Sequence, residues 1–174
     1  MAEVEGIDRT TLSLTSGHDE LIQRMATAHK KVAVVLSNGA PVTMPWLADV
    51  SAVLEGYLGG QAGAGGLAEV LTGKVCPSGK LAETFPLSLQ DTPAKPYPGG
   101  PVVVEYRESL YVGYRYYDTS KVDVLFPFGY GLSYTKFDYS DLNLKQIGDK
   151  VTVSFKVKNS GLVAGKEIAQ VYVR

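Results

Sequence analysis

Two short stretches with the character of strands, the apolar run 32–36 and the mostly apolar 51–58, alternate with helical segments in the first half of the chain. The first run is rich in valine and stops just before Asn38-Gly39, which is typical of a strand that is buried on both faces. A glycine-rich loop at 59–66 follows the second run and leads into a short helix predicted at 67–71. The order strand, loop, helix predicts an α/β fold with a mostly parallel sheet and helices on its faces.

Helical periodicity appears ahead of the first strand. Ser16 and Asp19 have the spacing of a capping box, and they predict the start of a helix from about residue 18 to residue 31. Apolar residues recur on one side of that helix, namely Leu21, Met25 and Ala28. Between the two strands, Pro41 and Pro45 leave room only for one or two helical turns at 46–50.

The pattern changes in the second half of the chain. Five prolines between residues 86 and 101 indicate an irregular surface linker. After Thr135 the apolar residues alternate with period two, which predicts three antiparallel strands. Their apolar positions are Phe137 and Tyr139; Val151, Val153, Phe155 and Val157; and Ile168, Ala169, Val171 and Val173. Three strands form an incomplete sheet, so we expect uncovered edges through which the chain could self-associate.

Composition excludes several classes of partner. The 174 residues carry 17 basic and 18 acidic side chains, and this net charge of −1 provides no field for nucleic acid or anionic lipid. A single cysteine, Cys76, rules out a disulfide framework and a multi-cysteine metal site, and His18 and His29 are too isolated to suggest another metal site. We expect no metal and no cofactor. The chain as given has no apolar run of membrane-spanning length and no signal-peptide layout, which predicts a soluble chain, cytoplasmic if taken as given.

The glycine-rich loop leaves two interpretations open. Residues 63–68 fit the pattern G-x-G-x-x-A, and Glu83 lies 20 residues after Gly63, as a dinucleotide-binding fingerprint requires. The alternative is a strand-to-helix turn in which glycine serves only tight packing. A phosphate-loop pattern ending at Gly79-Lys80 fails, because position 74 is lysine and position 81 is leucine.

Acidic side chains gather at the start of the chain, where Glu3, Glu5 and Asp8 lie in a segment without regular pattern. Such a segment is either a solvated loop or the carrier of a general acid whose surroundings keep it protonated. Aromatic residues are frequent between positions 106 and 134, where they serve either packing or stacking on a sugar. The residues alone do not decide between these alternatives.

Taken together, six segments resemble the C-terminal half of glycoside hydrolase family 3, the β-glucosidase group. They occur in the family's order over nearly the whole chain. The segments are Glu5-Gly6-Ile7-Asp8-Arg9; 32–42, which ends in Ser37-Asn38-Gly39-Ala40-Pro41-Val42; Tyr57-Leu58-Gly59-Gly60-Gln61-Ala62-Gly63; Pro77-Ser78-Gly79-Lys80-Leu81 with Glu83-Thr84-Phe85-Pro86; 112–118; and 126–134.

The resemblance implies a fold and a site. It implies a partial three-layer α/β sandwich at 1–86, a linker and aromatic-rich packing segment at 87–134, and the start of a fibronectin-III-like β-sandwich at 135–174. It also implies that Glu5 is the general acid/base of a retaining glycosidase and that Asp8, Arg9, Tyr57 and Gln61 support it or the substrate. The substrate implied is a β-linked glucoside or oligosaccharide.

The resemblance also implies what this chain lacks. In the family a separate (β/α)8 barrel carries the nucleophile, and the barrel does not occur in these 174 residues. We therefore expect a fragment of a β-glucosidase-like enzyme that is inactive alone. Cys76 and Ser109 depart from the family, which commonly has Asn and Gly there. A different class of function also stays open, namely a non-catalytic module that binds carbohydrate or protein.

Overall fold

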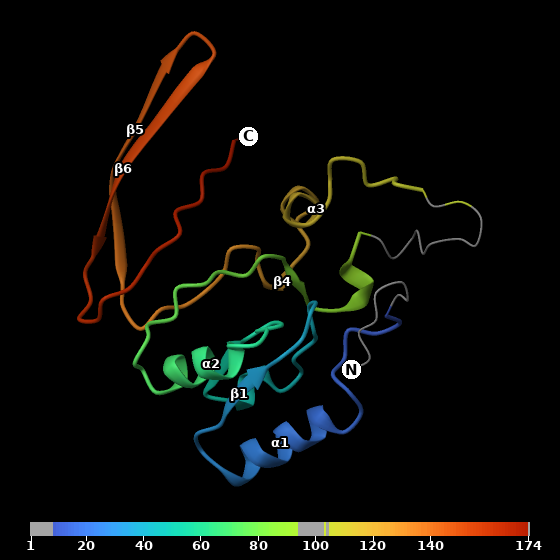
Figure 1. The fold of residues 1–174 in the computed structure, drawn as a ribbon. Coiled ribbons are helices and arrows are strands. Elements are labelled where there is room, and N and C mark those ends of the chain that lie inside the picture. Colours follow the sequence, from blue (N-terminus) through green and yellow to red (C-terminus); the bar gives the residue numbers. More distant parts are fainter. Residues whose placement is uncertain (1–8, 94–102, 104, 174) are drawn as a thin grey trace. The chain divides into compact units, whose positions relative to one another are not determined.

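A computed structural model describes residues 9–93, 103 and 105–173, and the chain divides into two compact units (Figure 1). The first unit comprises the chain up to Gly65 together with Leu81–Tyr130, and the second comprises Gly66–Lys80 with the chain from Gly131 onward. The first unit contains a parallel strand pair with helices, and the second contains an antiparallel hairpin. The α/β fold class predicted from the sequence is therefore confirmed.

The first two strands form the parallel pair. Strand β1, Ala33–Leu36, aligns with β2, Ala52–Glu55, so that Val34 lies opposite Val53. The prediction that this sheet is buried on both faces is wrong for β1, in which Leu36 is buried while Ala33 and Val35 are exposed. Successive side chains of a strand point to opposite faces. Of the four residues of β1, only Val34 and Leu36 therefore belong to the core cluster.

Helix α1, His18–Ala28, confirms the predicted helix, although it ends three residues earlier than residue 31. The predicted capping box is wrong: Gly17 occupies the N-cap at φ 86°, and no side chain caps the helix. The Asp19 carboxylate instead accepts a 2.7 Å hydrogen bond from the indole Nε1 of Trp46. This carboxylate therefore joins α1 to the segment between the two strands.

The core of the first unit is assembled largely from the segment between β1 and β2. Val42 and Trp46 are fully buried, and Phe85 is 1% exposed. The short 3-10 helix η1, Leu47–Asp49, follows directly and confirms the predicted helical turns. Partly buried apolar residues from the rest of the unit complete the cluster, among them Leu14, Ile22, Val53, Leu81 and Phe126.

The remaining elements of the first unit are short. Strand β3, Phe85–Pro86, pairs antiparallel with β4, Val124–Phe126, and the 3-10 helix η2, Leu89–Asp91, follows β3. Helix α3, Tyr114–Ser120, buries Tyr117 and stacks Tyr114 on Phe128 with ring centroids 5.2 Å apart. Several aromatic side chains of this region therefore serve packing, while Tyr106 stays 82% exposed.

Helix α2, Gly63–Leu71, starts four residues before the predicted start at residue 67. At Gly59, in the loop before this helix, a Cβ atom would lie 2.8 Å from the Cα of Gly63. The loop before α2 therefore requires glycine for a close backbone approach. Gly73 follows the helix at φ 74°, as expected of a glycine at a helix C-terminus.

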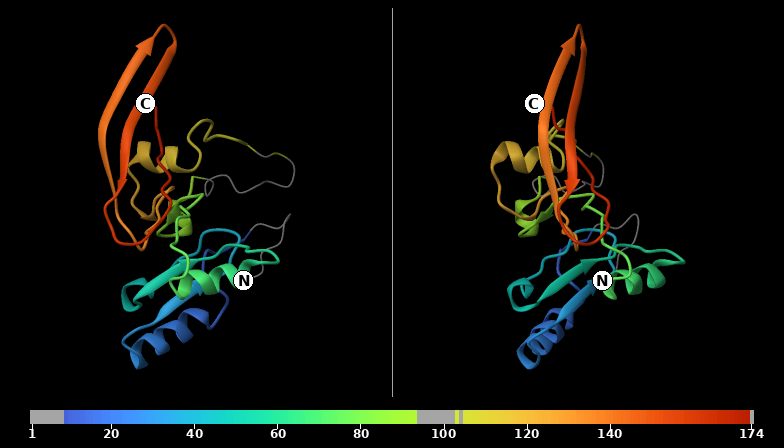
Figure 2. Two further views of the ribbon diagram at one scale, coloured as in Figure 1. Left: turned by 60° about the vertical axis from the view of Figure 1, so that its left-hand side comes forward. Right: turned by 90° about the vertical axis from the view of Figure 1, so that its left-hand side faces the viewer.

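The second unit contains a long hairpin of β5, Phe137–Ile147, and β6, Lys150–Asn159 (Figure 2). A bulge between Ser140 and Asn143 places Asp141 at φ 55°. The third strand predicted near residues 168–173 is wrong, because this exposed segment forms no strand. Among the described residues, the β5–β6 sheet has two strands only, and its outer edges carry no third strand.

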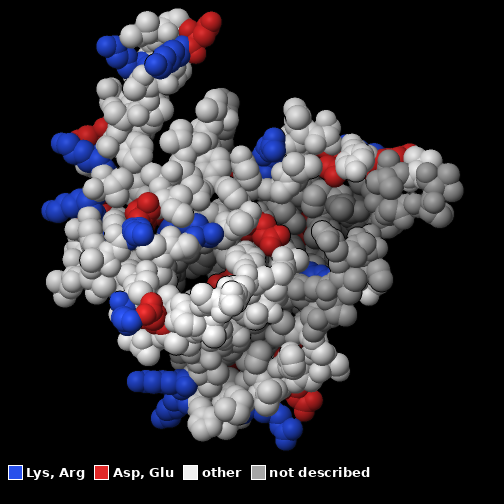
Figure 3. All heavy atoms as spheres, viewed as in Figure 1, with Lys and Arg blue, Asp and Glu red and all other residues white. Residues whose placement is uncertain are grey.

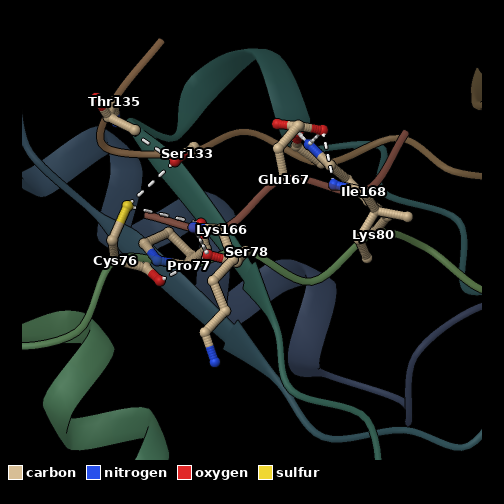
Figure 4. A network of polar contacts seen from close by, with 10 residues as sticks. Cys76, Pro77, Ser78, Lys80, Ser133, Thr135, Lys166, Glu167 and Ile168 are labelled. Carbon is tan, nitrogen blue, oxygen red and sulfur yellow. Dashed lines mark hydrogen bonds and ion pairs between the residues drawn. The ribbon is translucent and has the colours of Figure 1, made fainter. Parts of the chain in front are cut away.

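A polar network holds the beginning of that C-terminal segment within the second unit (Figure 4). The Lys80 ammonium lies 3.4 Å from a Glu167 carboxylate oxygen and donates to the Gly131 carbonyl at 2.7 Å. The backbone N–H of Lys166 donates to the Ser78 hydroxyl at 3.1 Å. The two charged side chains are only 14% and 15% exposed, so water weakens their attraction little.

Charged side chains elsewhere on the molecule are mostly exposed, and basic ones recur along the β5–β6 hairpin in Figure 3. One of them, Lys156, pairs with Asp141 at 2.6 Å. No helix in the described part of the chain is both long enough and apolar enough to cross a membrane.

Candidate functional site

The carboxyl ends of β1 and β2 bring polar side chains together at one edge of the parallel pair. Both strands run in the same direction and stop at Leu36 and Glu55. Ser37 and Asn38 follow the first strand, while Glu55 ends the second and Tyr57 comes two residues later. In parallel sheets this edge is where ligands usually bind, because the loops there are free to vary.

Glu55 is the centre of this edge. One carboxylate oxygen accepts a hydrogen bond from the Asn38 amide at 3.4 Å, and the other accepts one from the backbone N–H of Tyr57 at 3.0 Å. The Asn38 amide also donates to the Ala40 carbonyl at 2.9 Å. Asn38 is 3% exposed, and its side-chain oxygen has no partner among the described residues.

Tyr57 adopts a backbone conformation that is rare for a large side chain, with φ 46°. Two side chains hold it there: Glu55 accepts from its N–H, and the Ser37 hydroxyl donates to its carbonyl at 3.2 Å. Conformations of this kind cost about 1–3 kcal/mol and persist only where neighbours enforce them. The polar side chains of the edge thus fix the path of the loop that leads toward Gln61.

The Tyr57 hydroxyl is buried and has no well-formed hydrogen bond among the described residues. Burial raises the pKa of Tyr57 to about 12, and the carboxylates of Glu83 and Glu55 add to the rise, while the Ala82 backbone amide opposes it. Near neutral pH the phenol is therefore protonated and keeps a donor next to two acidic residues.

Arg9 anchors the first described residues to the segment that follows β1. Its guanidinium Nη2 donates to the Pro41 carbonyl at 2.6 Å, across 32 positions of sequence. Three residues later the Leu12 carbonyl accepts a hydrogen bond from the Thr43 backbone N–H at 2.9 Å. The chain from residue 9 to residue 12 is therefore attached at two points to the core segment.

The structure describes only some of the site residues that the sequence predicts. Glu5 and Asp8 lie outside the described residues. Arg9 and Tyr57 both contact the chain just after β1, through Pro41 and Ser37 respectively. Gln61 is exposed on the turn before α2.

Sequence reasoning missed two residues of this edge, Asn38 and Glu55. From sequence, Asn38 marks the end of the first strand and belongs to a family-matching segment without a role of its own, and Glu55 lies inside the predicted strand 51–58. A usable signal was available: Asn38 lies two residues beyond the end of the first run, and Glu55 is the one charged residue in 51–58. Parallel strands place such residues side by side.

The glycine-rich segment does not have the geometry of a nucleotide cradle. Residues 63–66 are already helical, whereas the fingerprint requires its first glycine in the turn between strand and helix. The close approach at Gly59 involves the protein's own backbone. The packing interpretation of this loop fits the structure better. Within the described ranges, no group of three or more histidine, cysteine, aspartate or glutamate side chains is arranged to hold a metal ion.

Comparison with known proteins gives consistent matches among β-glucosidases. Thermostable β-glucosidase B of Acetivibrio thermocellus is 54% identical over an alignment 177 positions long, which covers 99% of this chain and 23% of that enzyme. A β-glucosidase of Bacteroides ovatus is 42% identical, with 98% of this chain and 24% of the enzyme covered. The chain thus spans about a quarter of the length of these curated relatives.

Solved structures agree with the sequence matches. The β-glucosidase of Kluyveromyces marxianus superposes with a TM-score of 0.88 at 40% identity, covering 91% of this chain and 19% of that one. β-Glucosidase 3B of Thermotoga neapolitana in complex with α-D-glucose gives 0.86 at 40% identity, covering 90% and 24%. The family profile described as "Glycosyl hydrolase family 3 C-terminal domain" matches residues 1–134. Because that match covers most of the 174 residues, the chain belongs to glycosyl hydrolase family 3 and carries the family's C-terminal domain.

Proposed function

We propose that this chain supplies the general acid/base carboxylate, Glu5, of a retaining β-glucosidase-like enzyme. The nucleophile comes from a barrel that these 174 residues do not contain, and the substrate is a β-linked glucoside or oligosaccharide in a cleft shared with that barrel. The observation that carries the proposal is the 54% identity to a β-glucosidase over 99% of the chain, Glu5 to Arg9 included in the family match.

The chemistry requires two carboxyl groups about 5–5.5 Å apart. One attacks the anomeric carbon and forms a covalent glycosyl-enzyme, while the other protonates the departing oxygen and then deprotonates the incoming water. Glu5 takes the second role. In this proposal Arg9, Asp8, Tyr57 and Gln61 support the loop or the substrate.

A hybrid enzyme tests the proposal. In the hybrid, this chain replaces the matching stretch of the Acetivibrio thermocellus β-glucosidase, so that a complete barrel precedes it. The hybrid should hydrolyse cellobiose, and Glu5→Gln should lower kcat/KM for cellobiose by about 10²–10⁴, the usual contribution of general acid catalysis. A folded hybrid without activity, or a Glu5→Gln hybrid with unchanged activity, would contradict the proposal.

The isolated chain should show little or no turnover, because without the nucleophile no covalent intermediate forms. Assay of the purified chain with 4-nitrophenyl β-glucoside measures this directly. Robust hydrolysis that Glu5→Gln abolishes would show that the chain needs no barrel. The non-catalytic alternative predicts instead that glucosides bind the isolated chain and raise its melting temperature.

The domain boundaries at 86/87 and 134/135 belong to the same proposal. They are supported by the end of the family match at residue 134 and by the start of the hairpin at Phe137. Limited proteolysis should cut within 87–101 before it cuts within β5 or β6.

A further inference from the structure

The loop that leaves the carboxyl end of β2 presents a large apolar side chain to solvent. Leu58 is 74% exposed, and the four residues that follow it, 59–62, are exposed as well. Those four residues are two glycines, a glutamine and an alanine, so no bulky apolar neighbour in this stretch covers the leucine. The isobutyl group of Leu58 is therefore open to a ligand from that side.

The backbone on both sides of Leu58 is held in place. The Ser37 hydroxyl donates to the Tyr57 carbonyl at 3.2 Å, directly before Leu58. Directly after it, Gly59 lies so close to Gly63 that a Cβ atom would meet the Gly63 Cα at 2.8 Å. Leu58 thus lies between two constrained positions.

The conformation of Tyr57 separates Leu58 from the core. The Tyr57 ring packs against the core cluster of the first unit, and φ 46° at this residue ends the extended path of β2. Backbone strain of this kind concentrates at functional sites, where the surrounding structure enforces it. The strained residue therefore joins a ring in the core to an exposed leucine at the edge where parallel sheets bind ligands.

The chemistry of a retaining glycosidase decides which part of a substrate meets this edge. The acid/base carboxyl group protonates the oxygen of the leaving group, whereas the nucleophile bonds to the anomeric carbon on the opposite side of the scissile bond. In the proposed function this chain supplies the acid/base and the barrel supplies the nucleophile. The chain therefore faces the leaving group, and Leu58 is the exposed apolar side chain that its edge offers there.

We propose that Leu58 is a specificity-determining residue, which contacts the leaving group of the substrate and favours an alkyl or aryl group over a sugar. The inference rests on the proposed function, because it concerns one side of the same cleft. An apolar leaving group that covers Leu58 removes apolar surface of both partners from water, which stabilises the complex in proportion to the area buried. A sugar, whose surface is largely hydroxyl groups, gains less from the same contact.

Two substrates with alcohol leaving groups test the inference in the hybrid enzyme. Hexyl β-glucoside releases hexanol and cellobiose releases glucose, and both departing oxygens need a proton, so general acid catalysis affects both substrates alike. The ratio of kcat/KM for hexyl glucoside to kcat/KM for cellobiose does not depend on the amount of folded enzyme. Leu58→Gln replaces apolar surface by an amide and should lower this ratio about 5–10-fold, near the lower limit for a methylene group in a hydrophobic pocket.

Two further variants make the result specific. Leu58→Met keeps an apolar side chain and should leave the ratio within about twofold of the original. Leu71→Gln is the matched control, because Leu71 is a 51% exposed leucine at the far end of α2 from this loop, and it should leave the ratio unchanged. A ratio that Leu58→Gln does not change would overturn the inference. If both kcat/KM values then fall together, Leu58 packs against the rest of the enzyme and does not contact the leaving group.

The Glu5→Gln hybrid distinguishes this inference from the proposed function. Glu5→Gln should lower both kcat/KM values by similar factors, so that the ratio stays constant. If it does so while Leu58→Gln also leaves the ratio constant, the proposed function stands and the inference about Leu58 is wrong. If Glu5→Gln leaves both kcat/KM values unchanged, the proposed function itself is wrong.

Discussion

Individual residues at the carboxyl edge of β1 and β2 carry more constraint than their sequence context suggests. Tyr57 is held at φ 46° by Glu55 and Ser37, and its hydroxyl is buried among acidic neighbours. The sequence indicated Tyr57 only through a family resemblance. Positive φ at a tyrosine depends on side chains 2 and 20 positions away, and no local propensity encodes that.

The buried phenol of Tyr57 should make stability sensitive to alkaline pH. Its pKa is about 12 when folded and about 10 when unfolded, so the unfolded chain loses this proton first and stability falls as pH rises from 10 towards 12. Tyr57→Phe removes the effect and also removes a hydroxyl without a well-formed partner. Below pH 10 the variant should therefore match the original or exceed it by up to about 1 kcal/mol.

Urea denaturation of both proteins between pH 8 and 11.5 measures this difference. Tyr117, whose pKa is also raised to about 12, is present in both proteins and cancels. Above pH 10, the free energy of unfolding of the variant minus that of the original should increase as the pH rises. A difference that stays constant with pH would show that Tyr57 titrates alike in the folded and unfolded states.

At the scale of elements, periodicity predicted most of the regular structure and failed where tertiary contacts intervene. Helix α1 and both strands of the hairpin follow apolar spacing, and η1 follows the positions of Pro41 and Pro45. The capping box failed because Gly17 occupies the N-cap and the Asp19 carboxylate binds Trp46, 27 positions away. The third strand failed because 168–173 forms no ladder with β5 or β6, a pairing that alternation alone does not encode.

At the start of α1, Asp19 and Ser16 should contribute differently to stability. Asp19→Ala should lower the free energy of unfolding by about 1.5–3 kcal/mol, because it removes a charged acceptor and leaves the buried Trp46 indole N–H without its partner. Ser16→Ala should change it by less than about 0.5 kcal/mol, since no side chain caps this helix. Thermal or urea unfolding followed by circular dichroism compares the two. A larger loss of unfolding free energy in Ser16→Ala than in Asp19→Ala would show that Ser16 does cap the helix.

The Lys80–Glu167 pair should stabilise the second unit more than an exposed ion pair does. A double-mutant cycle of Lys80→Met and Glu167→Gln should give a coupling energy of about 1–2 kcal/mol, because both side chains are largely buried. The matched control is Lys74 with Glu69, whose side chains are 71% and 42% exposed and whose coupling should stay below about 0.5 kcal/mol. Equal coupling energies would contradict the argument from burial.

At the scale of the whole molecule, large apolar surfaces remain exposed. Tyr139, Leu144, Val151 and Val157 lie on one face of the β5–β6 hairpin and are each at least 42% exposed. A two-stranded hairpin with an open apolar face is at best marginally stable in water. The relatives are about four times as long as this chain. We therefore propose that other parts of the polypeptide cover this face in a complete enzyme, and that a second copy covers it when the chain is alone.

Sedimentation velocity of the isolated chain should therefore show association that increases with concentration. Leu144→Lys places a charge on the apolar face and should weaken the association at least about tenfold, a cost of roughly 1.4 kcal/mol. Lys145→Gln on the opposite face is the control and should have little effect. A monomeric original chain at every concentration would exclude the hairpin as an interface.

The family and the fold class followed from sequence, whereas the contacts that attach Arg9 and shape the Tyr57 loop required the structure. The account depends most on the role of Glu5. In a hybrid with Glu5→Ala, azide should accelerate turnover of 2,4-dinitrophenyl β-glucoside and yield β-glucosyl azide, because a small anion then intercepts the glycosyl-enzyme without needing a base. Turnover that azide leaves unchanged, with glucose as the sole product, would contradict the assignment of Glu5.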